Sequence, residues 1–387
     1  MASFFKDGKT WYYSIDIGKD QNGKRRKQKR GGFRTKKEAQ DAVTLIENDL
    51  LHNTFLIEKD ITFNDFAKEW LKSYDLQVKN STTRVREHEI GNLKKYFNLI
   101  KLKDITKKQY QDALIDLQKK GFAQNTIAGI HGTARMILKK AVELDVIKKD
   151  PTEFARPPRK VETLEDIANE KEIPKYLEKE DLATFLKIAH DAGLKSDYTT
   201  FLVLAYTGLR AGELCALKWA DIDFEGHTIK VARTYYNPKN NIIKYELQPP
   251  KTKSSRRVIN VAKRVTDELE IHRVKQNKFK MLNRDRWHDE DFIFCVPRYP
   301  GYPIYIKLIE GRMARLLKIS GLSKDLTPHS LRHTHTSLLA EAGVGLEEIM
   351  ERLGHSDDDI TRKVYLHVTK DMKKEAAHKF DTLMDNL

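Results

Sequence analysis

Two segments of the chain carry residues whose types and spacing suit chemistry at a phosphorus atom. One reads Thr-Gly-Leu-Arg and ends at Arg210; the other holds His329 and Arg332, then His355, and ends at Tyr365. A pair of arginines can neutralise a phosphate, histidines can move protons, and a tyrosine hydroxyl can attack phosphorus. The combination predicts phosphoryl transfer in which the protein itself is the nucleophile.

The same residues also fit one feature of a metal site. His329 and His333 are four positions apart, which is the spacing of two zinc ligands on one helix. The carboxylate that accompanies such a pair is missing, and Arg332 stands between the two histidines instead. A cation in that place disfavours metal binding, so no metal site is predicted. The sequence also lacks the glycine-rich motifs of ATP-binding and dinucleotide-binding proteins, and no cofactor is predicted.

The composition favours a polyanionic partner. The 387 residues include 71 Lys+Arg against 56 Asp+Glu, which gives a formal net charge of +15. Such an excess favours nucleic acid or an anionic membrane surface. No apolar run is long enough to span a membrane and the first residues do not resemble a signal peptide, so we expect a cytoplasmic protein with no membrane partner. Cys215 and Cys295 lie in apolar surroundings and are predicted to be reduced core thiols.

The N-terminal region, residues 1–57, is predicted to be a small three-stranded β-sheet with one helix. Residues 10–17 alternate in character, Asn22 and Gly23 form a strong hairpin turn signal, and residues 24–30 follow as the partner strand. The glycine pair at positions 31 and 32 is expected to end that strand, before a helix over residues 36–51.

Basic residues are concentrated on this hairpin. Between Lys19 and Lys37 there are ten basic residues and one acid, Asp20. Such a run is often a solvated face or a localisation-like tract, but its density on one short hairpin favours a DNA reader that enters a groove. The residues predicted to bind DNA are Lys24, Arg25, Arg26, Lys27, Lys29, Arg30 and Arg34.

Residues 60–150 are predicted to form an all-α domain. Thr62 and Asp65 resemble a capping box, and apolar residues recur after Thr62 at helical spacing. Further helices are expected at residues 81–97, 106–120 and 125–144. Residues 151–174 follow as a linker, since Pro151, Pro157 and Pro158 forbid a continuous helix and stiffen the segment.

The remaining residues, 175–387, are predicted to be mainly helical with a small antiparallel β-sheet. Helices are expected at residues 178–192, 199–206, 213–217, 265–278, 311–320, 331–342, 346–353 and 372–384. Strands are expected at residues 227–233, 242–247 and 257–261. The chain as a whole is therefore predicted to be a multidomain α+β protein.

Three blocks in this last region resemble the tyrosine recombinases, the integrases of phages and transposons. The blocks are Thr207-Gly-Leu-Arg210 with Glu213, His329-Ser-Leu-Arg332-His333, and Leu353-Gly354-His355 followed ten residues later by Tyr365. They occur in the family's order. The basic hairpin with its helix resembles the arm-site-binding domain of such integrases, and the helical region resembles their core-site-binding domain. The resemblance implies an arm-site domain at residues 1–57, a core-site domain at 60–150 and a catalytic domain at 175–387.

The resemblance also assigns roles at the phosphate. Arg210 and Arg332 would each direct N–H donors at non-bridging oxygens of one scissile phosphate, stabilising the charge gained in the transition state. Tyr365 would attack phosphorus and form a 3′-phosphotyrosine link, leaving a free 5′-hydroxyl. Glu213 would brace the arginines rather than act as an acid.

Proton transfer would fall to one lysine and two histidines. Lys251 lies in a hairpin loop between two expected strands and matches the family's general acid. Lys253 is the competing candidate, and a solvated basic loop is the ordinary interpretation of either lysine. His329 would accept or share the tyrosine proton, and His355 would hydrogen-bond the phosphate.

The predicted function is a site-specific DNA recombinase, an integrase that inserts and excises a mobile genetic element. Its expected partners are double-stranded DNA at core and arm attachment sites, further copies in a homotetramer on DNA, a host bending factor and an excisionase. It would act in the bacterial cytoplasm, on the nucleoid. A type IB topoisomerase and a non-catalytic DNA-binding regulator are the alternatives. The apolar face of residues 371–387 would pack either on its own domain or on a neighbouring protomer.

Overall fold

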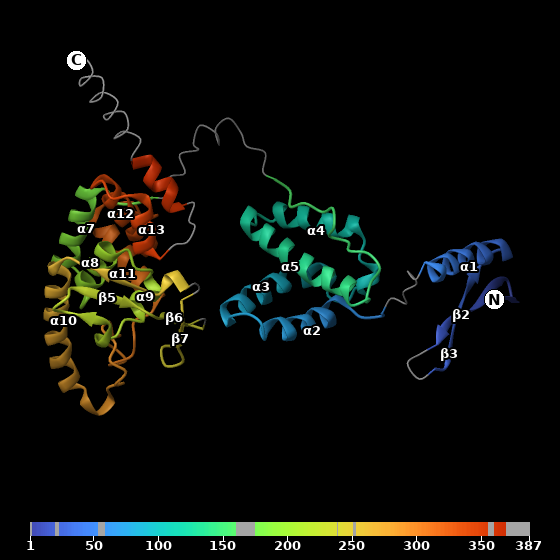
Figure 1. Cartoon of the computed structure of the whole chain (residues 1–387), viewed down its shortest axis with the longest axis horizontal. Helices are drawn as coiled ribbons and strands as arrows, with labels where there is room; N and C mark the ends of the chain where they lie inside the picture. The colour runs from blue at the N-terminus through green and yellow to red at the C-terminus, as the bar shows by residue number, and fades with distance from the viewer. Residues whose placement is uncertain are drawn as a thin grey trace, which may run out of the picture. The chain divides into compact units, whose positions relative to one another are not determined.

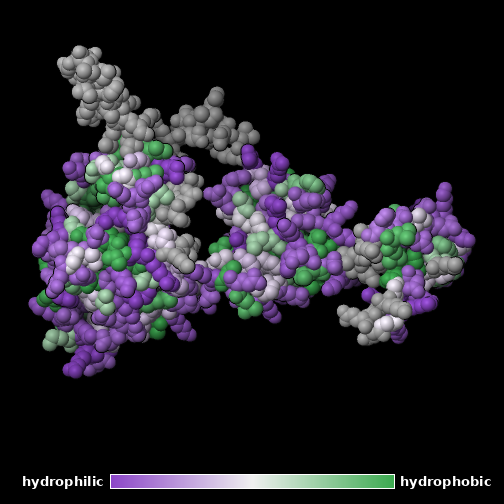
Figure 2. All heavy atoms as spheres, viewed as in Figure 1, coloured by the Kyte–Doolittle hydropathy of each residue, from purple (hydrophilic) through white to green (hydrophobic). Residues whose placement is uncertain are grey.

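The chain is organised as two compact units, residues 1–161 and 162–387 (Figure 1). The computed structural model describes residues 2–19, 23–52, 59–159, 175–237, 239–250, 253–354 and 360–368. The multidomain α+β architecture is confirmed, with an N-terminal three-stranded sheet, a helical region, and a mainly helical C-terminal unit with small antiparallel sheets. Hydrophilic residues cover most of the face shown in Figure 2. Within the described ranges, no helix is long and apolar enough to cross a membrane.

The N-terminal sheet is an antiparallel meander whose strands follow sequence order. Its elements are β1 (Ser3–Asp7), β2 (Thr10–Lys19), β3 (Arg25–Phe33) and the helix α1 (Lys36–Leu51). Tyr13 and Ile15 of β2 are buried together with Val43 of α1, which forms a small separate core. Thr35 begins the helix, because its hydroxyl accepts a hydrogen bond from the Glu38 backbone N–H at 3.2 Å.

The glycine pair that was expected to end the third strand lies inside it, so that expectation was wrong. β3 continues through Gly31 and Gly32 to Phe33, and its pairing with β2 shifts register at this point. A Cβ atom at Gly31 would come within 1.9 Å of the Tyr12 ring, and Gly32 has a φ of +91°. The pair therefore forms a bulge that allows an aromatic ring to lie against the strand backbone.

The helical region has the four helices that apolar periodicity predicted. They are α2 (Phe63–Asp75), α3 (Asn80–Phe97), α4 (Lys107–Lys119) and α5 (Gln124–Glu143), with a short 3-10 turn, η1 (Leu102–Asp104). Their apolar faces enclose one core, in which Phe63, Leu114 and Ile130 are almost fully buried. The Thr62 hydroxyl accepts from the Asp65 backbone N–H at 3.2 Å, as the capping signature predicted.

The chain stays packed on this region after α5. Pro151 and Thr152 are buried, and the backbone of Arg156 exchanges two hydrogen bonds with the Gln111 side chain, at 3.0 and 3.1 Å. The first residues of the expected linker are thus docked on α4. Residues 160–174 lie outside the described part of the chain, and the domain boundaries remain a prediction.

The C-terminal unit is built around a buried helix. Its helices are α7 (Lys179–Asp191), α8 (Asp197–Thr207), α9 (Ala211–Cys215), α10 (Lys263–Leu282), α11 (Ile306–Ser320), α12 (Pro328–Glu341) and α13 (Leu346–Leu353). Residues 360–368 are also helical. Because α8 is apolar on nearly all sides, it lies in the core, where α7, α10 and α12 pack against it.

Two small antiparallel sheets complete this unit. One has the order β4 (Ile222–Asp223), β5 (Thr228–Val231) and β8 (Arg257–Asn260), and the other pairs β6 (Thr234–Tyr236) with β7 (Glu246–Gln248). The expected strand at residues 242–247 was mostly wrong. The side chain of Asn237 accepts from the Asn241 N–H at 3.0 Å and donates to the Asn241 carbonyl at 2.9 Å, which holds this stretch in a turn.

Candidate active site

The Thr-Gly-Leu-Arg block lies at the corner between α8 and α9. Gly208 ends α8 with a φ of +63°, and a Cβ atom there would come within 2.6 Å of Leu353 and 2.8 Å of His335. Only glycine meets both demands without strain, since it tolerates positive φ and leaves room for the two neighbours. The tight corner places Arg210 at the start of α9, with its side chain about one third exposed (36%).

Glu213 holds Arg210 in place and also binds a second arginine. The carboxylate is 3% exposed; it accepts from Arg210 Nη1 at 2.7 Å and from the Arg210 backbone N–H at 3.1 Å. It also accepts from Arg257 Nη2 at 3.1 Å. Burial acts to raise the pKa of Glu213, but the attraction of Arg257 and Arg210 outweighs it and lowers the pKa below its ordinary value. Glu213 is therefore a buried anion that contacts two arginines.

Arg332 belongs to the His-Ser-Leu-Arg-His block and donates hydrogen bonds to the other two sequence blocks. It lies on α12 and is 2% exposed, and it is the largest fully buried side chain in the described residues. Nη1 donates to the Gly208 carbonyl at 2.6 Å and Nη2 donates to the Leu353 carbonyl at 2.7 Å. The three blocks that are far apart in the sequence thus meet at one guanidinium.

The Leu-Gly-His block is hydrogen-bonded to residues at or just before the start of β8. This strand follows the loop that contains Lys251 and Lys253, called the lysine loop below. Gly354 ends α13 with a φ of +71°, and a Cβ atom there would come within 3.2 Å of Ser254, Ser255 and Arg257. The Ser255 hydroxyl donates to the Gly354 carbonyl at 3.3 Å, and Arg257 Nε donates to the Arg352 carbonyl at 2.7 Å. The end of α13 and the start of β8 are therefore held together.

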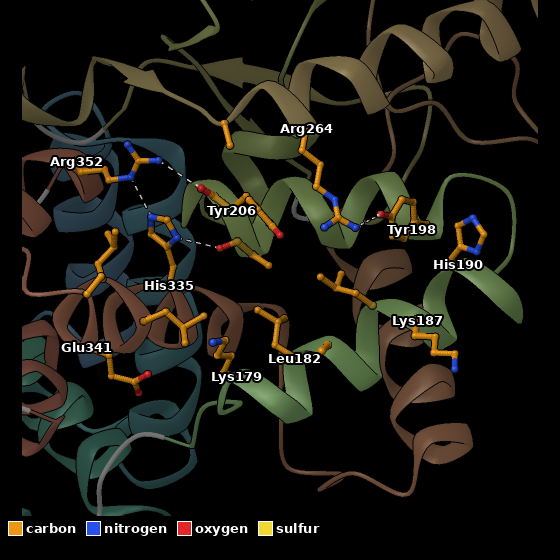
Figure 3. Close-up of a pocket in the computed structure, with 17 residues that line it drawn as sticks. Lys179, Leu182, Lys187, His190, Tyr198, Tyr206, Arg264, His335, Glu341 and Arg352 are labelled. Carbon is orange, nitrogen blue, oxygen red and sulfur yellow. Dashed lines mark hydrogen bonds between the residues drawn. The ribbon is translucent and has the colours of Figure 1, made fainter.

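A histidine between the blocks, His335, forms two hydrogen bonds that Figure 3 shows. His335 Nδ1 donates to the Ala205 carbonyl at 2.9 Å, and Nε2 accepts from Arg352 Nε at 3.0 Å. Burial and the charges of Arg352 and Arg332 lower the pKa of His335 to about 3, although the bond to Ala205 opposes them. His335 thus supports the packing of α12 against α8 and α13 as a neutral acceptor.

The proposed proton acceptor and nucleophile occupy different environments. His329 is exposed near the start of α12, with its ring edge-on to His333 at a centroid distance of 4.8 Å. Tyr365 is half-buried in the helix of residues 360–368 and packs on a small apolar cluster that includes Ile349 and Leu353. Tyr365 is therefore anchored through α13, the helix that also presents a carbonyl to Arg332.

Several predicted site residues fall outside the described part of the chain. These are Lys251, the side chain of Lys253, His355 and the C-terminal residues 371–387. The described residues contain no group of three or more His, Cys, Asp or Glu side chains placed to hold a metal ion. Both cysteines are unpaired: Cys215 is buried, whereas Cys295 is partly exposed.

The predicted DNA-binding residues lie on and beside β3. Lys24, Arg25, Arg26, Lys27, Lys29, Arg30 and Arg34 are all exposed. Arg25 approaches the Asp16 carboxylate at 4.0 Å, which in an exposed pair is a weak interaction. An exposed basic strand can present its side chains to a phosphate backbone or a groove.

Sequence reasoning missed Arg257 and Arg352 as parts of this region. A signal for Arg257 was present, because β8 alternates and Arg257 shares a face with the buried Ile259. An arginine on the inner face of a strand requires a partner, and Glu213 provides it. Arg352 offered no such signal, since its acceptors are the carbonyls of Tyr206 and Asn260 and the ring of His335.

The family is decided by a sequence match over the C-terminal unit. The profile of the phage integrase family matches residues 175–372, just over half of the chain. The chain belongs to the phage integrase family. The Arm DNA-binding domain matches residues 4–50, and the N-terminal SAM-like domain of phage integrases matches residues 62–118. As a member, the protein is a tyrosine-type site-specific recombinase, an enzyme class that cuts and rejoins DNA through a phosphotyrosine intermediate.

Relatives of this integrase occur in phages and in conjugative elements. The integrase of Staphylococcus phage L54a is 29% identical over 339 residues, covering 84% of this chain and 94% of that protein. A XerC-like tyrosine recombinase of Caldanaerobacter subterraneus is 29% identical over 400 residues, covering 99% of this chain and 98% of that protein. The ICEBs1 integrase of Bacillus subtilis is 26% identical, covering 90% of this chain and 91% of that protein.

Solved structures of integrases share the fold. The Tn1549 transposon integrase in complex with transposon right end DNA has a TM-score of 0.65 at 24% identity, covering 82% of this chain and 99% of that chain. A lambda integrase dimer bound to a core site has a TM-score of 0.55 at 17% identity, covering 94% of each chain.

Proposed function

We propose that this integrase cleaves DNA with Arg210 and Arg332 at the scissile phosphate and Tyr365 as nucleophile. The observation that carries the proposal is the position of Arg332, whose two Nη atoms donate to Gly208 and to Leu353. These contacts place the Arg210 corner and the end of α13 on either side of one guanidinium. Tyr365 packs against the same helix end.

The cleavage step then follows from the chemistry of the residues. The Tyr365 oxygen forms a bond to phosphorus while the bond from phosphorus to the 5′-oxygen breaks, which leaves a 3′-phosphotyrosyl link and a 5′-hydroxyl. His329 takes the tyrosine proton, and Lys251 gives a proton to the leaving oxygen, with Lys253 as its competitor. His355 donates a hydrogen bond to the phosphate. Rejoining is the same step in reverse with a new 5′-hydroxyl.

Arg332 requires a change of surroundings before it can contact a phosphate. Its side chain is 2% exposed, and two of its N–H groups point at backbone carbonyls. We propose that DNA binding opens the elements around it, so that the guanidinium adds phosphate oxygens to its acceptors. Arg210 is accessible already, and it would bind the phosphate first.

We also propose that the N-terminal regions bind DNA and that the integrase acts with further partners. We assign residues 1–57 to arm sites, 60–150 to core sites and 175–387 to catalysis, with 151–174 as the connection. The integrase would act as a homotetramer on double-stranded DNA at the nucleoid, integrating and excising a mobile element. A host bending factor and an excisionase would set the direction. The exposed basic side chains of β3 support the arm assignment.

A nicked suicide substrate tests the cleavage chemistry. Because the nick releases the short leaving strand, the covalent adduct accumulates and can be counted on a denaturing gel. We expect the wild-type protein to form the adduct in the presence of EDTA. The Tyr365→Phe variant should form no adduct but should still bind DNA. An adduct in Tyr365→Phe, or one abolished by EDTA, would contradict the mechanism. Relaxation of plasmids that lack an attachment site would indicate a topoisomerase instead.

A further inference from the structure

Arg257 contacts three separate parts of the catalytic unit. It lies at the first position of β8, just after the lysine loop, and its side chain is 7% exposed. Its Nη2 donates to Glu213 at 3.1 Å, its Nε donates to the Arg352 carbonyl at 2.7 Å, and its Nη1 donates to the Ser255 carbonyl at 3.2 Å. A basic residue of a solvated loop would not be buried, and its guanidinium would not donate hydrogen bonds to three different residues.

The charges around Glu213 show what the contact with Arg257 achieves. One buried carboxylate is shared by two guanidinium groups, Arg210 Nη1 at 2.7 Å and Arg257 Nη2 at 3.1 Å. The three side chains together carry one net positive charge. Without Arg257, the remaining ion pair of Arg210 and Glu213 would be neutral, and its attraction for a phosphate would be much weaker. Arg210 would still be near the phosphate, but Glu213 would neutralise its charge.

The backbone contacts of Arg257 act on the other side of the site. Arg352, whose carbonyl accepts from Arg257, is followed by Leu353, whose carbonyl accepts from Arg332. Gly354 comes next and packs with its Cα against the side chain of Arg257, as the 3.2 Å approach of a Cβ there indicates. The guanidinium thus fixes the backbone that leads directly into His355.

We propose that Arg257 is a positioning residue for strand cleavage. It neutralises Glu213, so that Arg210 keeps its charge for the phosphate. It also holds the end of α13 against β8, the strand after the lysine loop. The inference rests on the proposed roles of Arg210 and Tyr365. Arg257 acts through Glu213 and the α13 backbone, and it does not itself touch the reacting atoms.

The test is a comparison of Arg257→Met with Arg256→Met at saturating protein on the nicked substrate. Arg256 directly precedes β8 and is exposed, so both variants lose one charge from adjacent positions but only one loses the buried contacts. Outer partners that orient metal ligands are commonly worth about 10- to 100-fold in affinity or activity, and we take the same range for a group that orients a phosphate-binding arginine. We expect Arg257→Met to slow adduct formation by about that factor, with DNA affinity changed no more than in Arg256→Met. Arg257→Lys, which keeps the charge without the planar fork, should fall between wild type and Arg257→Met.

A double-mutant cycle with Glu213→Gln separates positioning from a merely structural role. The glutamine removes the charge that Arg257 neutralises, so Arg257→Met should cost clearly less in the Glu213→Gln background than in wild type. Equal losses in both backgrounds, or a loss confined to DNA affinity, would overturn the proposal. If Arg257→Met does not fold, the same cycle is run with Arg257→Lys. Failure of the cleavage mechanism would be seen separately, as an adduct that survives Tyr365→Phe.

Discussion

Replacing Gly208 by alanine probes whether the corner before Arg210 is as tightly enclosed as the structure indicates. Gly208 and Gly321 form a matched pair, because each ends a helix of the same unit with a positive φ, +63° and +71°. Their surroundings differ. A Cβ atom at Gly208 would lie 2.6 Å from Leu353 and 2.8 Å from His335. A Cβ atom at Gly321 would have open space for 4 Å among the described residues, its own helix and chain neighbours apart.

The expected magnitudes follow from this difference. An alanine in the left-handed region costs about 1–2 kcal/mol at either position. Gly208→Ala adds an overpacking cost of about 1–3 kcal/mol, since two buried side chains must move. For a unit of this size, each kcal/mol lowers Tm by about 2–4 °C. Gly321→Ala should therefore lower Tm by about 2–8 °C and Gly208→Ala by about 4–20 °C, and scanning calorimetry of the full chain measures both.

Activity gives a second measurement on the same pair. The Gly208 carbonyl accepts from Arg332, and Arg210 follows two residues later, so a displaced corner moves both proposed phosphate ligands. At a temperature where both variants are folded, Gly208→Ala should form adduct more slowly than wild type, and Gly321→Ala should match wild type. Equal losses of Tm in the two variants, or wild-type cleavage by Gly208→Ala, would refute the inference that this corner is closed by Leu353 and His335.

Three further outcomes can be measured on the full chain. Glutamine in place of the basic residues at positions 24–30 should weaken arm-site binding and lower its salt slope by up to about 0.9 per lost phosphate contact, with core-site cleavage largely intact; gel shifts at several salt concentrations report this. The pKa of His335 is lowered from 6.5 to about 3, so the unfolded chain binds a proton that the folded chain does not between those values. The unfolding free energy should therefore fall as the pH drops through that window, and urea titrations of His335→Asn should show a shallower fall than wild type. Burial raises the pKa of the Cys295 thiol to about 12, and it also raises the pKa of the Cys215 thiol above its ordinary value. Both should react slowly with a disulfide reagent at pH 8 and rapidly in urea.

Helices were predictable because their signals are local. Apolar periodicity and the caps at Thr35 and Thr62 placed the N-terminal helices within a residue or two, and the bounds Leu346–Leu353 of α13 agree with the prediction. The predicted start of α11 was wrong, because the helix begins at Ile306 rather than at residue 311. Other failures were in strands. Gly31 lies inside β3 because an aromatic ring from the neighbouring strand occupies the space of its missing side chain, and such a contact cannot be read along one strand.

The residues of the site were easier to name than their contacts. Their types and order predicted phosphate chemistry, but Arg332 donates to the main-chain carbonyls of Gly208 and Leu353, and carbonyls are groups that every residue possesses and no motif marks. Arg257 was overlooked for a related reason. Its role depends on Glu213, which is 44 residues away in the sequence, and only folding brings the two together.

The way in which the arginines are held explains how they remain useful as cations. Gly208 and Leu353 lie at the C-terminal ends of α8 and α13, where carbonyls lack helical partners and the helix dipole is negative. The two carbonyls at these ends are neutral acceptors for Arg332, and hydrogen bonds to neutral groups do not cancel its charge. A carboxylate would hold an arginine more firmly but would cancel its charge, and where one is used, at Glu213, two arginines share it. Firm positioning and retained charge are competing demands, and carbonyl acceptors together with a shared carboxylate satisfy both.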